Sequence, residues 1–268
     1  MSTRIIAVAN QKGGVGKTTT SINLGTALAA AGRRVLIIDF DAQGNASTGL
    51  GIPPSERELT SYDVVIDKTP IQNATKETII PRLFIVPGDE NLSGVETKLS
   101  DDARRSYRFR DAMDAYRRDA ASGVVEPYDF ILVDCPPSLS SLTINAMTGC
   151  DAVLVPLQCE FFAMEGLSQL LRTVDVVRGA LNPDLEIQGV VLTMYDRRNA
   201  QSDQVAADVR AFFGAKVYQT VIPRNVRLSE APGFGKPALL YDHKCPGSEA
   251  YIRLASELIQ KEKERVAA

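Results

Sequence analysis

A glycine-rich stretch near the start of the chain constrains the fold more than any other feature. An apolar run at residues 5–9 leads into Lys12-Gly13-Gly14-Val15-Gly16-Lys17-Thr18-Thr19, and a helix-forming sequence follows. Glycines let backbone N–H groups converge on an anion, and the first helical turn adds its unpaired N–H groups and its dipole. Lys17 can reach the β- and γ-phosphates of a nucleotide, and Thr18 is placed to bind Mg²⁺. We therefore expect a strand, a phosphate-binding loop and a helix that form a nucleoside triphosphate site.

The loop departs from the usual P-loop pattern at its first position. Gln11 stands where G-x-x-x-x-G-K-[ST] has glycine, and a second lysine, Lys12, precedes the glycines. With this lysine the chain resembles the deviant Walker A ATPases of the ParA/MinD family, and most closely the ParA/Soj chromosome-partitioning branch. The resemblance implies that ATP or ADP is bound with Mg²⁺ by residues 12–19. It also implies an ATP-dependent homodimer in which Lys12, catalytic together with Lys17, reaches the phosphates of the other subunit.

Two further strands end in aspartates that belong near this loop. The apolar run at 34–39 leads into Asp39-Phe40-Asp41, and the run at 129–134 ends in Asp134. Ligands in open α/β sheets lie beyond the carboxyl ends of the strands, so these carboxylates are expected beside the loop. Asp134 fits the Walker B position, where it would hold the Mg²⁺ shell through water, although it could instead cap the next helix.

The segment after the second predicted strand resembles the family's switch motif D-x-D-P-Q-G-N. The chain has Ala42 where proline is usual, which should loosen the turn slightly and leave the carboxylates in place. The resemblance implies that Asp41 is catalytic and orients the attacking water or a water bound to Mg²⁺. One aspartate of the pair could serve only to cap the next helix, and Asp39 suits that role better than Asp41.

The periodicity of the remaining chain predicts an α/β fold. Apolar runs predict further strands at residues 83–87, 152–157, 187–194 and 217–222, and helical spacing predicts helices at 17–31, 61–66, 104–121, 164–181 and 248–265. Such a series forms a mostly parallel, twisted sheet with helices on both faces, here of the P-loop NTPase type. A chain of 268 residues with 44% apolar content can bury one substantial core, and no linker divides it, so one domain over 1–268 is expected.

Two segments late in the chain carry the expected contacts to adenine. The strand predicted at 187–194 ends in Met194, and the run predicted at 217–222 leads into Pro223-Arg224-Asn225. By resemblance to the family, these residues flank the base of the nucleotide.

The same two segments carry arginines that the resemblance assigns to DNA. Arg197 and Arg198 follow Met194, and Arg224 and Arg227 lie in the second segment. Binding of DNA without sequence preference needs only a local cluster of basic side chains that neutralise phosphates. The four arginines could equally be solvated loop residues or ion-pair partners, and Arg224 could serve the nucleotide.

Composition limits the other classes of function. The net charge of −3 argues against a globally basic nucleic-acid binder but leaves room for a local basic patch. Four cysteines without C-x-x-C spacing, and His243 as the single histidine, predict buried free thiols and no zinc site. No apolar run approaches the roughly 20 residues that span a membrane. Residues 1–4 lead straight into the first strand and leave no room for a signal peptide, so a cytoplasmic, nucleoid-associated protein is expected.

Three function classes remain open from the sequence. A partitioning ATPase would bind non-specific double-stranded DNA as an ATP dimer, and a ParB-like centromere-binding protein would stimulate hydrolysis. A MinD-like membrane-associated ATPase would need an amphipathic C-terminal anchor, but no Phe, Trp or Leu follows Leu258. An iron protein of the nitrogenase type or a dethiobiotin-synthase-like ligase is the third class, although no second cysteine accompanies Cys135 in the pattern that an iron–sulfur cluster needs.

Overall fold

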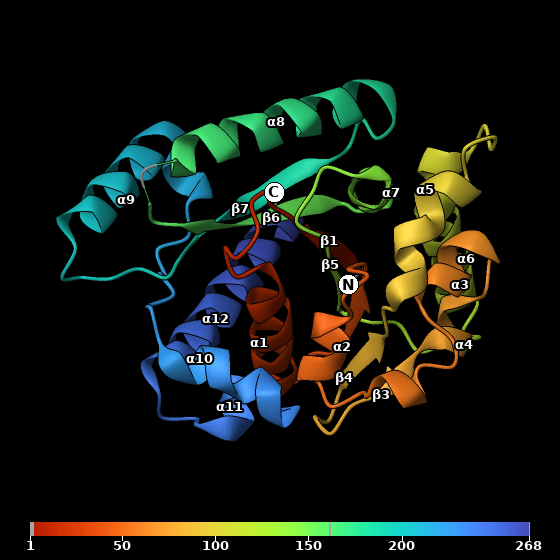
Figure 1. Ribbon diagram of the computed structural model, residues 1–268, viewed down its shortest axis with the longest axis horizontal. Helices are drawn as coiled ribbons and strands as arrows, with labels where there is room; N and C mark the ends of the chain where they lie inside the picture. The colour runs from red at the N-terminus through yellow and green to blue at the C-terminus, as the bar shows by residue number, and fades with distance from the viewer. Residues whose placement is uncertain (1–2, 161, 268) are drawn as a thin grey trace.

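Seven strands form one sheet in the computed structural model, which describes residues 3–160 and 162–267 (Figure 1). Residues 1, 2, 161 and 268, which include both ends of the predicted domain, lie outside the described residues. The order is β3-β4-β2-β5-β1-β6-β7, and β3 at the edge pairs antiparallel with β4 while the other pairs are parallel. The strands are β1 (Arg4–Val8), β2 (Val35–Asp39), β3 (Lys76–Glu77), β4 (Leu83–Val86), β5 (Phe130–Asp134), β6 (Ala152–Gln158) and β7 (Glu186–Thr193).

Helices cover both faces of the sheet, as predicted. The side chains of α1, α2, α10, α11 and α12 contribute to one hydrophobic core, and those of α3 to α9 to the core on the opposite face. Figure 1 shows α1 and α12 on one side of β6 and β7, and α8 on the other. The helices are α1 (Lys17–Ala30), α2 (Asn45–Gly49), α3 (Ser61–Ile66), α4 (Ile71–Ala74), α5 (Val95–Lys98), α6 (Arg108–Ala121), α7 (Ser141–Gly149), α8 (Ala163–Ala180), α9 (Ala200–Phe213), α10 (Val226–Glu230), α11 (Ala238–Tyr241) and α12 (Pro246–Ala267), with 3₁₀ turns at Pro54–Glu56, Glu90–Gly94, Arg105–Tyr107, Gly214–Lys216 and Ala231–Phe234.

The sheet order brings the predicted nucleotide elements together at one edge. β1 lies between β5 and β6, and β5 also pairs with β2. In this register Asp134 lies opposite Val8 on one side and opposite Asp39 on the other. Because parallel strands end at the same edge, the loop after β1 and both aspartates share one end of the sheet.

The prediction of a strand at 217–222 is wrong. Isolated bridges join Val217 to Val190 and Pro223 to Tyr195, and no continuous ladder forms between them. The segment still follows β7, since the Ile222 amide donates to the Leu192 carbonyl at 2.8 Å.

A carboxylate of α12 explains this departure from the prediction. Glu257 accepts hydrogen bonds from the Gln219 amide at 2.8 Å and from the Thr220 amide at 3.0 Å. Those two donors are therefore turned toward a side chain and away from β7. The other predicted elements are shifted by a few residues at their ends, the largest shift being that of α6, which begins at Arg108 after the short turn Arg105–Tyr107.

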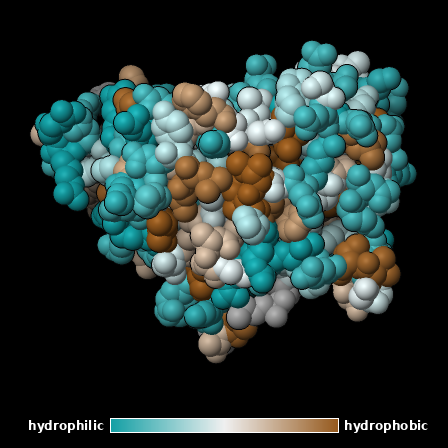
Figure 2. Space-filling view, turned by 90° about the horizontal axis from the view of Figure 1, so that it is seen from below, coloured by the Kyte–Doolittle hydropathy of each residue, from teal (hydrophilic) through white to brown (hydrophobic). Residues whose placement is uncertain are grey.

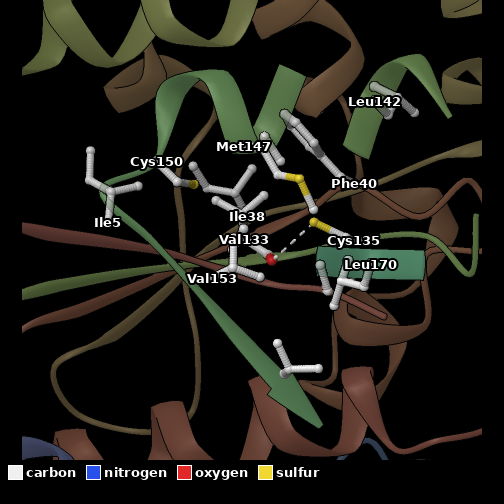
Figure 3. Close-up of a cluster of buried hydrophobic side chains, with 14 of the residues drawn as sticks. Ile5, Ile38, Phe40, Val133, Cys135, Leu142, Met147, Cys150, Val153 and Leu170 are labelled. Atoms are coloured by element: carbon white, nitrogen blue, oxygen red, sulfur yellow. Dashed lines mark hydrogen bonds between the residues drawn. The ribbon is translucent and has the colours of Figure 1, made fainter. Parts of the chain in front are cut away.

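The four cysteines are free and buried, which confirms the prediction from their spacing. Figure 3 shows Cys135 and Cys150 among apolar side chains of the core, where the Cys135 thiol donates to the Val133 carbonyl at 3.7 Å. Burial raises the pKa of both thiols. No helix within the described residues is long and apolar enough to cross a membrane.

Candidate functional site

The loop between β1 and α1 has the backbone that phosphate binding requires. Gly14 and Gly16 have φ values of 75° and 89°, a conformation that side chains with a Cβ rarely adopt. The loop is fixed at both ends, because Asn10 Oδ1 accepts a hydrogen bond from the Lys12 amide at 3.0 Å and Thr193 Oγ1 donates to the Val15 carbonyl at 2.8 Å. The second bond joins the loop to the end of β7.

The two lysines of the loop lie in different surroundings. Lys17 is 6% exposed, and its Nζ donates to the Lys12 carbonyl at 3.0 Å. Burial lowers the pKa of Lys17, and the charges of Asp134 and Asp41 oppose that shift. The Lys12 side chain is 44% exposed and forms an ion pair with Glu160, just beyond β6. One ammonium therefore lies inside the site and the other outside it.

Asp134, the predicted ligand of the metal shell, lies at the end of β5. It is fully buried, and its Oδ1 accepts a hydrogen bond from Ser21 Oγ at 2.8 Å. Burial and the nearby charge of Asp39 raise the pKa of Asp134, and Thr18 and Ser21 oppose that shift. Asp134 Oδ2 has no well-formed hydrogen bond to any residue within 3–160 and 162–267. A buried oxygen of this kind suits an ion or its water.

The donor set fits magnesium better than a metal held by protein alone. Within the described residues no group of three or more His, Cys, Asp or Glu side chains could hold a metal ion. Mg²⁺ is usually bound through one or two carboxylates together with waters and substrate phosphates. Thr18, Asp134 and the half-buried Asp41 provide such a set beside the phosphate loop.

Asp39 takes the capping role that the sequence left open. Its Oδ2 accepts hydrogen bonds from the Ser47 amide at 2.9 Å and the Ser47 hydroxyl at 2.7 Å, so it holds the first turn of α2. The side chain is fully buried, and burial raises its pKa. Asp41 is half-buried, and its Oδ1 accepts from the Gln43 amide at 3.0 Å. Asp41 is therefore the carboxylate of the pair that can face a nucleotide.

Three residues that support the segment from Asp39 to Asp41 were not predicted from the sequence, namely Ser47, Arg57 and Gly88. Gly88 packs so closely that a Cβ there would lie 2.8 Å from the Asp39 carbonyl oxygen and 2.9 Å from that of Asp41. Its amide donates to Ser47 Oγ at 3.0 Å, and its carbonyl accepts from Arg57 at 2.9 Å. The Pro87-Gly88 pair at the end of the predicted strand at 83–87 marks a turn, but the local sequence does not show which backbone Gly88 contacts.

The residues predicted to flank adenine line one cavity with the phosphate loop. Its volume is about 250 Å³, and Met194 at its wall has a φ of 50°, an uncommon conformation for a residue with a side chain. Tyr251 of α12 also lines the cavity and was not predicted. The lining comprises Gly16, Thr19, Thr193, Met194, Ile222, Pro223, Arg224, Asn225, Leu228, Ser229 and Tyr251.

Three of the four arginines predicted for DNA gather around a second, larger hollow. Its volume is about 910 Å³, and Arg197, Arg198 and Arg224 line it. Arg253 of α12 lines it as well and was missed, because more than 20 residues of sequence separate it from the others. Arg227 is not part of this lining and lies on α10.

Comparison with known proteins places the chain among named relatives. A family model described as an AAA domain matches residues 3–187. The chromosome partitioning protein ParA of Caulobacter vibrioides (strain NA1000 / CB15N) is 64% identical over 264 residues, which are 98% of this chain and 97% of that protein. The sporulation initiation inhibitor protein Soj of Bacillus subtilis (strain 168) is 49% identical over 255 residues, 95% of this chain and 98% of that protein.

A solved structure agrees with this placement at the level of the fold. Cobyrinic acid a,c-diamide synthase from Mycobacterium smegmatis, crystallised with an ATP analogue and magnesium, superposes with a TM-score of 0.83 at 35% identity. The match covers 97% of this chain and 96% of that one.

Proposed function

Because the chain belongs to the family of the chromosome-partitioning proteins ParA and Soj, we propose that it is an ATPase whose ATP-bound dimer holds DNA without sequence preference. Hydrolysis separates the dimer and releases the DNA. A ParB-like centromere-binding protein stimulates that step and so couples it to the segregation of a chromosome or plasmid. The cofactors are ATP or ADP and Mg²⁺, and the protein works in the cytoplasm on the nucleoid.

The contrast between Lys12 and Lys17 carries this proposal. A single phosphate loop needs one buried lysine, and Lys17 fills that position with 6% exposure. Lys12 extends from the same loop with 44% of its side chain exposed and is held by Glu160 at the surface. An exposed ammonium beside the phosphate site can neutralise the γ-phosphate of a facing subunit, a contact that exists only in a dimer.

Within one subunit the residues divide the work of phosphoryl transfer. Lys17 and the loop amides bind the β- and γ-phosphates, and Asp41 orients the attacking water. Thr18, Asp41 and Asp134 would hold Mg²⁺, which offsets negative charge on the phosphates when bound. Met194, Pro223, Arg224 and Asn225 enclose the base in the cavity next to Gly16.

The arginine-lined hollow supports the DNA part of the proposal. Arg197, Arg198 and Arg224 meet there although the protein as a whole carries a charge of −3. A dimer would double this local positive field, which links DNA affinity to ATP.

The membrane-bound alternative loses support from α12. Tyr251, Leu254 and Leu258, the apolar stripe of that helix, are buried in the core and cannot at the same time insert into lipid. We therefore propose that the protein does not bind membranes. Co-sedimentation with anionic liposomes that depends on ATP would contradict this proposal.

The proposed cycle is tested by measuring DNA binding and mass together. The protein is mixed with duplex DNA of two unrelated sequences without nucleotide, with ADP, with ATP and with a slowly hydrolysed ATP analogue, while light scattering reports its mass. We expect a dimer and DNA binding of both duplexes only with ATP or the analogue, and longer-lived binding with the analogue. Equal DNA binding by an ADP-bound monomer would contradict the proposal.

A further inference from the structure

We propose that three carboxylates, Asp196, Glu230 and Asp242, compete with DNA phosphates for Arg198 and Arg227. We call them the guard carboxylates. On this view DNA gains these two arginines only in exchange for internal ion pairs, so the guard carboxylates weaken DNA binding and keep it reversible. The inference rests on the proposed function in that DNA is the ligand.

Arg227 lies beside its two guards and a tyrosine. Its Nη1 lies 2.9 Å from Glu230 Oε2, and its Nε lies 3.5 Å from Asp242 Oδ2. The guanidinium also lies 5.9 Å from the centre of the Tyr241 ring. Two negative charges therefore face one positive charge. A phosphate approaching this arginine is opposed by both carboxylates.

The setting of Arg227 is a surface and not a core. α10 and α11 lie at the lower side of the molecule in Figure 1, and Figure 2 views it from below, where apolar side chains gather near the centre among polar ones. The Arg227 side chain is 49% exposed, and those of Glu230 and Asp242 are 41% and 36% exposed. Exposed ion pairs of this kind contribute little to folding, so they can be exchanged for a phosphate.

Arg198 is guarded by a tighter contact with a single carboxylate. Its Nε and Nη2 donate to the two oxygens of Asp196 at 3.0 and 2.8 Å, and its backbone amide donates to Asp196 Oδ1 at 3.0 Å. The Arg198 side chain is nevertheless 88% exposed. The side-chain and backbone donors of Arg198 lower the pKa of Asp196 to about 2. This guard therefore keeps its charge at every pH at which the protein would meet DNA.

Two of the arginines that share the hollow with Arg198, namely Arg197 and Arg224, provide the contrast. Neither Arg197 nor Arg224 makes an ion pair with a carboxylate anywhere in residues 3–160 and 162–267. Phosphates can bind these two without breaking an ion pair, although the charge of Asp196 also acts on Arg224. The proposed DNA surface thus combines open contacts with guarded ones, and a guanidinium that binds a carboxylate through two donors is suited to bind a phosphate in the same way.

Conservative variants test the guards because they remove the charge and keep the size and shape of each side chain, although an amide keeps only one acceptor oxygen. Glu230→Gln with Asp242→Asn is compared with Asp196→Asn and with the unmodified chain. DNA affinity is measured with the slowly hydrolysed ATP analogue at several salt concentrations on two unrelated duplexes. Each removed guard should tighten binding about two- to fivefold, the range expected from exposed ion pairs. The plot of log affinity against log salt should become steeper, by about one unit for each phosphate contact that a freed arginine gains.

Two controls separate a guard from a change in overall charge. Glu96→Gln with Asp101→Asn removes two exposed carboxylates near α5, on the other side of the sheet, and should leave DNA affinity unchanged. When Arg227→Ala is combined with Glu230→Gln and Asp242→Asn, the gain in DNA affinity from these two substitutions should disappear. When Arg227→Ala is combined with Asp196→Asn, the gain in DNA affinity from Asp196→Asn should remain. A gain that persists without Arg227 would overturn the guard assignment of Glu230 and Asp242.

The outcomes also distinguish this inference from the function on which it rests. If the unmodified dimer binds DNA and the guard variants, with unchanged thermal unfolding and ATP-dependent mass, bind it equally or more weakly, the guard proposal is wrong. If the unmodified protein binds no DNA in any nucleotide state, the proposed function itself fails. Weaker binding with a lowered unfolding temperature would show that the carboxylates only stabilise their loops, which also overturns the proposal.

Discussion

The nucleotide edge of the sheet and the arginine-bearing surface are built in opposite ways. At the nucleotide edge, Asp39, Asp134 and Lys17 are buried, and neighbouring side chains or backbone hold each of them. On the arginine surface, Arg198 and Arg227 are exposed and pair with carboxylates a few residues away or across a turn. Buried and fixed groups bind with large free energies, whereas exposed pairs are worth little and exchange readily. The difference suits one region to chemistry and the other to reversible attachment.

Lys17→Ala should have the largest effect, because it should abolish ATP binding at the nucleotide edge. Without the ammonium, the γ-phosphate charge is poorly neutralised in a partly desolvated site. We expect loss of ATP binding by calorimetry, and with it loss of the dimer, of hydrolysis and of DNA binding. Lys98→Ala, an exposed lysine of α5, is the matched control. ATP affinity close to that of the control would contradict the P-loop assignment.

Lys12→Ala should separate ATP binding from assembly. Lys12 lies outside its own site, so the monomer should still bind ATP through Lys17. We expect no ATP dimer by light scattering and no hydrolysis. Gly13→Val should give the same result through bulk at the facing loop, since among the described residues of its own subunit a Cβ at Gly13 would come within 4 Å only of Pro137, at 3.8 Å. An ATP dimer of normal stability in both variants would rule out the crossing lysine.

Asp41→Ala should spare ATP binding and the dimer but slow hydrolysis. A group that positions water or acts as a base typically contributes about 10²–10⁴-fold in rate. The expected species is an ATP-locked dimer that stays on DNA, measured by phosphate release and by DNA retention. Asp39→Asn is the variant to compare with it. Because Asp39 caps α2, Asp39→Asn should lower the unfolding temperature more than Asp41→Ala does, and it should slow hydrolysis less. A monomeric Asp41→Ala protein in ATP would give Asp41 a role in binding instead.

The sequence predicted the nucleotide edge well because its signals are local. A glycine loop between a strand and a helix, and aspartates at the ends of apolar runs, each lie within one short stretch. The contacts that hold those groups join distant parts of the chain. Ser21 reaches Asp134 across 113 positions of sequence, and Gly88 lies under Asp39 through packing alone.

The arginine surface was predicted less completely for the same physical reason. Arg198 and its guard Asp196 are two residues apart, so their pairing is visible locally, whereas Asp242 and Arg253 join the surface only through the fold. The strand expected at 217–222 fails in a related way. Its apolar pattern is that of a strand, but two of its amides bond to Glu257, which no local pattern reveals.

Arg227→Glu should have the smallest effect of these substitutions, because it should change DNA binding and leave ATP binding and the dimer intact. One reversed charge per subunit changes two contacts in a dimer, and each lost phosphate contact should lower the salt slope of DNA binding by about one unit. The new carboxylate would lie beside Glu230 and Asp242, so three like charges would face the phosphate and the loss should exceed that of Arg227→Ala. ATP binding and the dimer should survive, because Arg227 does not line the cavity that we assign to adenine. Unchanged DNA affinity and salt slope in both variants would remove Arg227 from the DNA surface, and equally silent reversals of Arg197 and Arg198 would place the DNA-binding function itself in doubt.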